Sequence, residues 1–182
     1  MPTEQENFMA QALALAAEAA AAGEVPVGCV IVRDGEIVGR GRNRREEKQA
    51  TASHAEMEAI AQANERLGTW RLDDCELYVT LEPCPMCAGA IIQARIPRVV
   101  FGARDEKFGA CGSVCDLFGM KFNHHPAMEE GLMAEEAKEL MREFFQDLRV
   151  TLRTRPKWRS SKPSPAGEGG PGAARDGCGG DT

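Results

Sequence analysis

A chain of 182 residues with 43% hydrophobic residues is long enough for one domain with a buried core. The formal net charge of -6 argues against wholesale nucleic-acid binding, and no apolar run is long enough to cross a bilayer. Seven cysteines, two of them in a metal-type spacing, indicate a reducing compartment rather than a disulfide framework. The alanine-rich start lacks the basic segment of a signal peptide. We therefore expect a cytoplasmic protein that binds neither membrane nor DNA.

The first quarter of the chain carries one helix signal and then a hairpin signal. Alanine, leucine, glutamine and glutamate fill the first segment and a glycine follows it, which is typical of a helix with its C-cap. A β-branched apolar run and an Asp-Gly pair then indicate two strands joined by a tight turn. The predicted elements are a helix over Glu4–Ala22, strands over Val27–Val32 and Glu36–Arg42 with a turn at Asp34-Gly35, and a loop over Asn43–Thr51.

The middle of the chain continues the alternation of helices and strands. Ser53 is placed to cap a helix that runs to about Arg66, and Glu56 could complete a capping box with it. The other predicted elements are a strand over Glu76–Leu81, a helix from Pro85 to about Ala94, and a strand over Arg98–Gly102. This order predicts an α/β domain whose helices cross over a central sheet.

The last third is less regular until its final helix. Residues 103–125 predict an irregular segment with a short helix near Ser113–Phe118, in which Cys111 and Cys115 act as small buried hydrophobes. Apolar residues recur at intervals of three and four residues from Leu132 to Leu148, which predicts an amphipathic helix. The composition then changes to Gly, Pro, Ser and Ala. We expect a domain over residues 1–155 and a disordered tail over residues 156–182.

Two short motifs carry the chemistry. Cys84 and Cys87 stand three residues apart around Pro85, which suits the first turn of a helix, so both thiols face the same side near a positive helix end. His54 lies thirty residues upstream and could supply a third metal ligand. Glu56 follows His54 too closely for good ligand geometry and is better placed as an acid or base beside the metal. His-x-Glu with Pro-Cys-x-x-Cys is the signature of zinc nucleobase deaminases.

Other interpretations of these motifs stay open on the residues alone. A Cys-x-x-Cys pair can be a redox pair or half of a structural zinc site, for which His124 or His125 would supply the fourth ligand. Glu56 could be no more than a capping residue. The two halves together favour a catalytic zinc site, in which three protein ligands leave one position for water. Glu56 would then carry a proton from that water to the substrate ring.

Charge is unevenly spread along the chain. Basic residues gather between Arg40 and Lys48 and again between Arg149 and Arg159, whereas acidic residues gather between Glu129 and Glu143. The basic segments indicate either a solvated surface or a footprint for a polyanion, and charge alone does not decide between them.

The chain resembles the bacterial tRNA-specific adenosine deaminases of the zinc cytidine and deoxycytidylate deaminase superfamily. The resemblance spans about Asn7–Leu152 and rests on Glu24–Gly28, the Asn43 loop, His54–Glu56, Leu77–Ala90, Arg98–Asp105, Asn123-His124 and Phe144-Phe145. It implies a three-layer α/β/α cytidine-deaminase-like fold with a central mixed sheet, and a homodimer with one Zn²⁺ per subunit. It also implies conversion of adenosine to inosine at the wobble position in the anticodon stem-loop of tRNA, here an arginine tRNA.

The resemblance also assigns site residues. It implies that zinc is held by His54, Cys84 and Cys87 and that Glu56 is the catalytic proton carrier. The substrate-binding positions that it implies are Asn43, Glu24, Val25, Pro26, Pro83, Asp105 and Phe145. Ser53, where the family often has alanine, and the Gly/Pro-rich tail depart from the pattern. The alternatives are a deaminase of a free base or nucleotide, of the guanine or dCMP type, and a structural zinc module that only binds nucleic acid.

Overall fold

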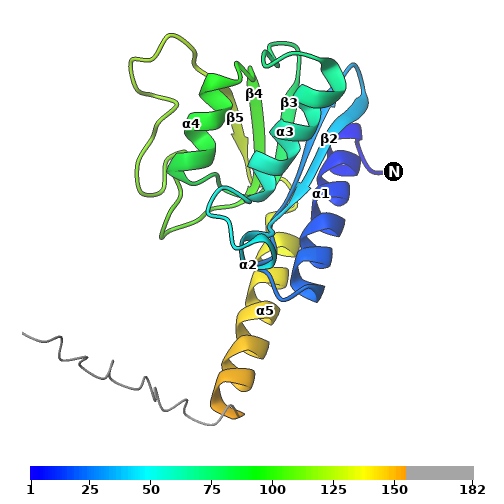
Figure 1. Ribbon diagram of the computed structural model, residues 1–182, viewed down its shortest axis with the longest axis vertical. Coiled ribbons are helices and arrows are strands. Elements are labelled where there is room, and N and C mark those ends of the chain that lie inside the picture. The colour runs from blue at the N-terminus through cyan, green and yellow to red at the C-terminus, as the bar shows by residue number, and fades with distance from the viewer. Residues whose placement is uncertain (155–182) are drawn as a thin grey trace, which may run out of the picture.

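A computed structural model describes residues 1–154, which form a five-stranded sheet between two layers of helices (Figure 1). The strands are β1 (Gly28–Arg33), β2 (Glu36–Arg42), β3 (Glu76–Leu81), β4 (Arg98–Ala103) and β5 (Ala127–Glu130). The helices are α1 (Glu4–Ala21), α2 (Arg45–Lys48), α3 (Ala55–Leu67), α4 (Pro85–Gln93) and α5 (Ala134–Thr154).

The sheet is mixed, as the sequence predicts. Its strand order is β2-β1-β3-β4-β5, with β1 antiparallel to both of its neighbours and β3, β4 and β5 parallel to one another. The hairpin turn between β1 and β2 has positive φ at both Asp34 (51°) and Gly35 (76°), the backbone that an Asp-Gly pair favours. Because β3 and β4 are parallel, their carboxyl ends lie at one edge of the sheet, where ligand sites of α/β folds occur.

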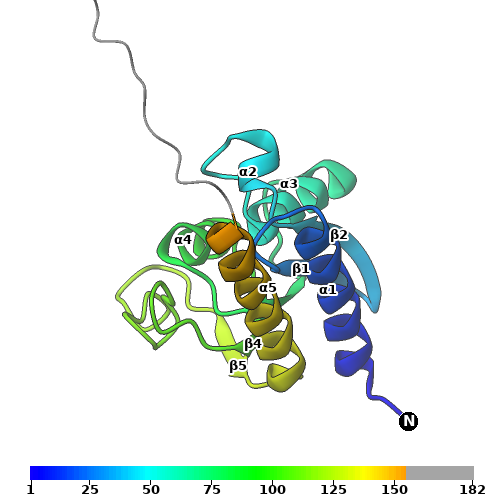
Figure 2. The same cartoon turned by 90° about the horizontal axis from the view of Figure 1, so that it is seen from below.

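Alternate residues of the strands supply two separate cores. Cys29, Ile31 and Phe101 are buried together with side chains of α3 and α4, whereas Val30 and Tyr78 are buried together with side chains of α1. Figure 2 shows α1 and α5 beside each other on one face of the sheet, with α3 and α4 on the other. The three-layer α/β/α arrangement that the resemblance implies is therefore confirmed.

Two glycines of β2 let α3 lie directly on the sheet. A Cβ added at Gly39 would stand 2.3 Å from the carbonyl oxygen of Ala59, and one added at Gly41 would stand 2.0 Å from that of Ala55. These separations leave no room for any side chain, so the backbone of α3 packs against the strand itself. The contact at Gly41 fixes the start of α3, immediately after His54.

The segment between β2 and α3 differs from the prediction in two ways. The expected loop over Asn43–Thr51 contains the short helix α2, which ends at Gln49 in a left-handed conformation. The N-cap of α3 is His54 rather than Ser53, and no side chain caps it. The backbone of Ser53 is instead tied into the preceding loop, where its N–H donates to Ala50 and its carbonyl accepts from Arg44. The capping-box interpretation of Glu56 is therefore wrong.

The segment after β4 also differs. No helix forms over Ser113–Phe118, because the backbone closes on itself through an isolated bridge between Cys111 and Asp116. Cys111 is buried as expected, but Cys115 is exposed. Strand β5 was not predicted: its four residues are all exposed and include no β-branched side chain, so neither signal of a strand is present.

The predicted tail over residues 156–182 lies outside the described residues, as does the last residue of the expected domain. Within residues 1–154, none of the helices combines the length and the apolar character that a membrane crossing requires.

Replacing Gly41 with alanine should destabilise the protein, because the new methyl group would push α3 away from β2. We expect a loss of about 1–3 kcal/mol, the usual cost of overpacking. Thermal melting should show a fall of several degrees, since about 1 kcal/mol corresponds to roughly 2–4 °C in a chain of this size.

Glu36→Ala is the control, because Glu36 is an exposed residue of the same strand. This variant should melt within about 2 °C of the wild type, since exposed substitutions usually change stability by about 0.5 kcal/mol or less. Equal melting temperatures for Gly41→Ala and the wild type would contradict direct packing of α3 on the strand.

Candidate active site

Two helix N-termini bring the predicted ligands together. His54 is the N-cap of α3 and Cys84 is the N-cap of α4, where Pro85 occupies the first turn as its sequence position predicts. Cys87 lies one turn further along α4 and is buried. The Nδ1 atom of His54 is 3.6 Å from the Sγ atoms of both cysteines, and the three ligand atoms lie within 4.8 Å of one another.

These distances suit a tetrahedral zinc ion. Bonds of about 2.3 Å to sulfur and about 2.0–2.1 Å to nitrogen, at a tetrahedral angle, put nitrogen and sulfur about 3.5 Å apart. The separations of 3.6 Å in this chain agree with that value. One nitrogen and two sulfur donors also form a recurrent set for catalytic zinc, which keeps a fourth position for water.

The three predicted ligand side chains share protons unevenly. The pKa of Cys84 is lowered to about 4, chiefly by a hydrogen bond with Cys87 and further by one with His54. The same contact with Cys84, together with burial, raises the pKa of Cys87 far above its usual range. The hydrogen bond with Cys84 raises the pKa of His54. A cation bound here would need both thiolates, so its binding releases protons.

Glu56 lies beside the ligand group and is not part of it. Its side chain is 4% exposed, and it contacts Cys87 from the first turn of α3. Burial raises the pKa of Glu56 to about 7, and the negative charge of Cys84 adds to that effect. A buried carboxyl group next to three metal ligands, with a pKa near neutrality, is suited to carry a proton.

A pocket of about 450 Å³ opens onto this group, and His54, Glu56 and Cys84 all line it. Among the predicted substrate-binding residues, Asn43, Val25 and Asp105 also line the pocket. The pocket lies at the edge of the sheet where β3 and β4 end. Its walls come from the segment just before β1, from α2, and from the loop that follows β4.

Glu24 and Pro26 lie behind the pocket wall. Both are buried, and the Oε1 atom of Glu24 accepts a 2.7 Å hydrogen bond from the backbone N–H of Glu47 in α2. The amide of Asn43 donates to the carbonyl of Val25 at 3.3 Å, and its Oδ1 atom accepts from the N–H of Arg45 at 3.4 Å. Glu24 therefore anchors α2, and Asn43 links α2 to the segment before β1.

Pro83 and Phe145 lie outside the pocket lining. Pro83 is buried, and its carbonyl accepts a 2.8 Å hydrogen bond from the N–H of Ala110, so it ties the cysteine segment to the loop after β4. Phe145 is exposed on α5 and makes an edge contact with Phe144.

The alternative ligands His124 and His125 are occupied elsewhere. The Nε2 atom of His124 lies 2.7 Å from the carbonyl oxygen of Ile96, and the Nδ1 atom of His125 lies 3.0 Å from that of Phe118. Neither histidine belongs to the ligand group that the described residues form. The fourth protein ligand that a structural zinc module needs does not come from them.

Sequence reasoning missed several residues of the pocket wall. The unpredicted lining residues with reactive, charged or bulky side chains are Arg45, Thr51, Glu82, Met86 and Phe108. Glu82 stands next to the predicted Pro-Cys motif, so its place in the pocket could have been found. Arg45 begins the short helix α2 and Phe108 lies in the loop after β4, and no periodicity or motif marks either of them.

Glu82 holds the loop that follows β4. Its carboxylate is 2% exposed and accepts from the N–H groups of Asp105 (3.0 Å), Cys111 (3.0 Å) and Ser113 (3.1 Å), and from the Ser113 hydroxyl. Burial raises the pKa of Glu82, but these hydrogen bonds outweigh it and lower the pKa below its usual value. A single buried carboxylate thus joins the cysteine segment to the facing wall of the pocket.

The three-layer fold and the His-Cys-Cys group with its neighbouring glutamate define a deaminase of the cytidine-deaminase-like class. The chain belongs to the MafB19-like deaminase family, whose model matches residues 3–149, and within it to the tRNA-specific adenosine deaminases. The resemblance that the motifs indicate is confirmed.

Curated relatives and solved structures give the degree of similarity. The tRNA-specific adenosine deaminase of Streptococcus pyogenes serotype M18 (strain MGAS8232) is 48% identical over 144 residues, which cover 79% of this chain and 91% of the relative. That of Bacillus subtilis (strain 168) is 46% identical over 148 residues, covering 81% and 92%.

Among solved structures, one from a study of A-to-I editing by tRNA:A34 deaminases at the wobble position of transfer RNA matches with a TM-score of 0.72. It is 44% identical, and the match covers 74% of this chain and 98% of that chain. The guanine deaminase from Nitrosomonas europaea matches with a TM-score of 0.62 and 26% identity, covering 76% and 83%.

Replacing Glu82 with glutamine should loosen the loop after β4, because an amide nitrogen cannot accept the hydrogen bonds that a carboxylate oxygen accepts. Leaving buried N–H groups unsatisfied costs about 1–3 kcal/mol. Hydrogen exchange should quicken at the backbone amides of Asp105, Cys111 and Ser113, which all donate to Glu82.

Glu106→Gln serves as the control, since Glu106 is an exposed carboxylate on the same loop. It should leave these exchange rates unchanged. Unaltered exchange in Glu82→Gln would show that the loop does not depend on this carboxylate.

Proposed function

We propose that this protein catalyses the hydrolytic deamination of adenosine to inosine at the wobble position of tRNA, with an arginine tRNA as the substrate that the resemblance implies. The observation that carries the proposal is the His54–Cys84–Cys87 group with buried Glu56 beside it in a lined pocket. The relatives of 46–48% identity are named for this reaction on tRNA, which supports the choice of substrate.

His54, Cys84 and Cys87 would hold one zinc ion per subunit. A zinc ion supplies Lewis acidity in such a site and lowers the pKa of water to about 7. Glu56 takes a proton from the attacking water and delivers it to a ring nitrogen of adenine, while the water oxygen adds to the carbon that bears the amino group. Glu56 then takes the second proton from the added hydroxyl, which becomes the carbonyl, and gives it to the departing amine. Water is consumed, ammonia leaves, and the ring becomes that of inosine.

The other predicted residues divide into those that face the base and those that support the wall. Asn43 and Val25 line the pocket and are proposed to contact the extruded nucleoside, whereas Asp105, also in the lining, is proposed to lie near a flanking nucleotide. Glu24, Pro26 and Pro83 lie behind the wall and are proposed to act through α2 and the cysteine segment that they hold. Phe145, on exposed α5, is proposed to contact nucleotides that flank the wobble position.

A free-base or nucleotide deaminase is the competing function. The guanine deaminase from Nitrosomonas europaea shares the fold, but it is only 26% identical to this chain. The tRNA-specific relatives are 46–48% identical over a similar share of the chain. The tRNA substrate is therefore preferred.

The shape of the molecule supports an extended substrate. Helix α5 extends past the sheet at the end that carries α2 and the starts of α3 and α4 (Figure 1). Its last turns carry Arg149 and Arg153, and α2 carries Arg45 and Lys48. Cations on both segments offer contacts for the backbone phosphates of an RNA. A tRNA substrate also implies that the protein works in the cytoplasm.

The protein is proposed to be a homodimer, on the basis of the resemblance and of a face of small residues on α4. A Cβ at Gly89 would meet nothing within 4 Å, and Ala90 is half-buried. Light scattering at micromolar concentration should give twice the mass of the chain. The mass of a single chain would contradict the dimer.

Replacing Glu56 with alanine should separate metal binding from catalysis. The variant should keep one zinc per chain, because its ligands are untouched, and should lose deamination by about 10²–10⁴-fold, the usual effect of removing a proton carrier. Metal analysis and inosine formation on an anticodon stem-loop measure the two properties in the same sample.

Glu65→Ala is the control, since Glu65 is an exposed glutamate on the same helix. It should keep both zinc and activity. If Glu56→Ala were purified without zinc under conditions where the control holds it, Glu56 would be a ligand and the proposed mechanism would be wrong.

The substrate can be tested directly with short RNA. An anticodon stem-loop with adenosine at the wobble position should be deaminated, whereas free adenosine, cytidine and guanine should not. Activity should fall steeply with added salt, because phosphate contacts release counterions. The variant Arg149→Glu with Arg153→Glu should weaken binding of the stem-loop and leave zinc content unchanged.

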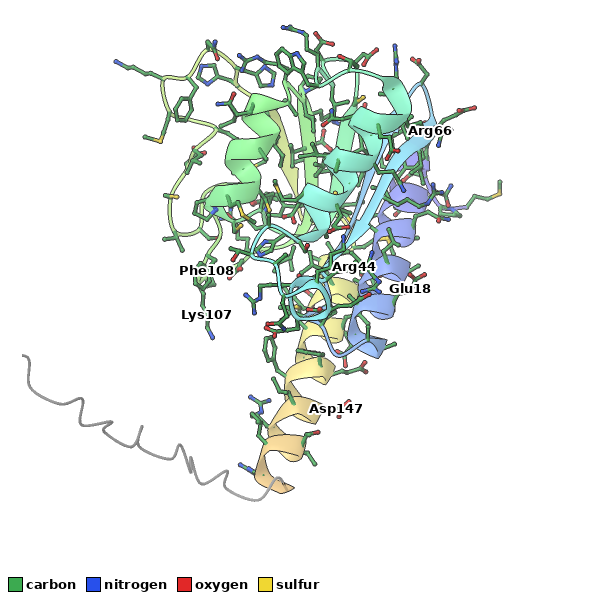
Figure 3. All side chains as sticks on the ribbon, in the orientation of Figure 1. Glu18, Arg44, Arg66, Lys107, Phe108 and Asp147 are labelled. Atoms are coloured by element: carbon green, nitrogen blue, oxygen red, sulfur yellow. The ribbon has the colours of Figure 1, made fainter. Side chains whose placement is uncertain are left out.

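Arg66→Glu provides the matched charge reversal, because Arg66 lies in the last turn of α3, at the end of that helix away from His54 and the pocket (Figure 3). It should bind the stem-loop as the wild type does. Turnover of a free base with no activity on the stem-loop would refute the tRNA assignment and favour the free-base alternative.

A further inference from the structure

One aromatic side chain at the mouth of the pocket, that of Phe108, belongs to no ring contact and no core cluster of the described residues. Phe108 is 67% exposed, more than any other large apolar side chain of the described residues except the first methionine. It nevertheless lines the pocket that holds the ligand group. Figure 3 shows it projecting with Lys107 from the loop after β4, at about the height of Arg44 in this view and well below Arg66.

The backbone around Phe108 is held at several points. The Oδ1 atom of Asp105 accepts from the N–H groups of Lys107 (2.9 Å) and Phe108 (3.2 Å), and its carbonyl accepts from the N–H of Gly109 (2.8 Å). Asp105 is in turn fixed by Glu82 through its own N–H at 3.0 Å. A Cβ at Gly109 would stand 2.4 Å from the Glu82 carboxylate, so the loop is pressed closely onto it. The ring is therefore presented to solvent by an ordered turn.

An exposed aromatic ring on a fixed turn is costly to maintain in water and suited to stacking. Apolar surface favours burial, and a ring that loses little freedom on contact binds a flat partner with a small entropic cost. Single-stranded RNA offers such partners, because its unstacked bases lie on aromatic side chains. A base extruded into the pocket leaves its neighbours unstacked at the mouth, which is where Phe108 lies.

We propose that Phe108 is a stacking platform for a nucleobase adjacent to the reacting adenosine, so that this side chain contributes to RNA binding outside the pocket. The inference rests on the proposed function, since it requires a polynucleotide substrate. It adds a contact that the motifs do not mark, on the wall opposite α2.

The charges around the ring fit a nucleotide. Lys107 is exposed next to Phe108, and Arg45 lines the same pocket from α2. Glu106 is also exposed on this loop, and Asp105 uses its carboxylate to hold the turn. Cations thus lie on both sides of the mouth, where a backbone phosphate on either side of the stacked base can reach them.

The experiment combines variants of Phe108 with RNA substrates that lack one base beside the reacting adenosine. Phe108→Ala, Phe108→Trp and the control Val114→Ala are assayed on a wobble-adenosine stem-loop and on two versions of it. One version has an abasic residue on the 5′ side of the adenosine, and the other has it on the 3′ side. Val114 is 59% exposed further along the same loop and does not line the pocket.

On the intact stem-loop, Phe108→Ala should lower kcat/KM by about 5- to 150-fold, the range that loss of one base–aromatic stack produces. Phe108→Trp should retain activity, and Val114→Ala should match the wild type. On one of the two abasic substrates the kcat/KM of the wild type should fall to that of Phe108→Ala on the intact stem-loop, and the kcat/KM of the variant should fall no further. On the other, the full effect of Phe108→Ala should remain.

Three results would overturn the inference. The first is equal activity of Phe108→Ala and the wild type on the intact stem-loop. The second is an undiminished effect of Phe108→Ala on both abasic substrates. The third is a shift of Phe108→Ala to a smaller mass in light scattering, which would assign the ring to contact with a second copy of the chain. A wild type without activity on the stem-loop would refute the proposed function itself, and the stacking role with it.

Discussion

The site depends on one geometric constraint, which is that the N-termini of α3 and α4 must meet at the same edge of the sheet. His54 and Cys84 are the N-caps of these helices, so any movement of either helix separates the ligand atoms. The glycines of β2 allow α3 to rest on the strand backbone, and α4 is buried through Ala88 and Ile91. Both helix ends also point their N–H groups toward the site, which favours the thiolates that a metal requires.

The remainder of the pocket is attached to this core by buried carboxylates. Glu82 precedes the cysteine segment and holds the loop after β4, and Glu24 precedes β1 and holds α2. Each carboxylate is almost fully buried and accepts hydrogen bonds from the backbone of a segment more than twenty residues away in the sequence. The walls are irregular in secondary structure, yet they are fixed because their backbone donors are satisfied by these two side chains.

The sequence predicts the regular part of this architecture well. The bounds of β2 and β3 agree with the prediction, and those of α1 and α4 agree within one residue, because their periodicity, turn residues and proline placement are local signals. The grouping of His54 with Cys84 and Cys87 could also be predicted, because the motif spacing and the ligand types together indicate a metal site. The predicted capping role of Ser53 and the predicted helix near Ser113 were wrong, and β5 was missed. Backbone hydrogen bonds within the loop hold Ser53, the Glu82 carboxylate binds the backbone of Ser113, and pairing with β4 forms β5. Phe108 and Arg45 line the pocket because hydrogen bonds to Glu82 and Glu24, which are distant in sequence, hold their segments there.

The separation between a common core, which holds the metal ligands, and the pocket walls attached to it explains how one fold serves different substrates. The guanine deaminase neighbour shares the overall arrangement at 26% identity, so the sheet and helix starts do not select the substrate. Selection must come from the parts that the core merely supports, namely α2, the loop after β4 and the end of α5. In this chain those parts carry exposed cations and an exposed ring around an open pocket. A free base would leave these groups in water, whereas a polynucleotide would cover them, and covering them supplies binding energy that the pocket alone does not provide.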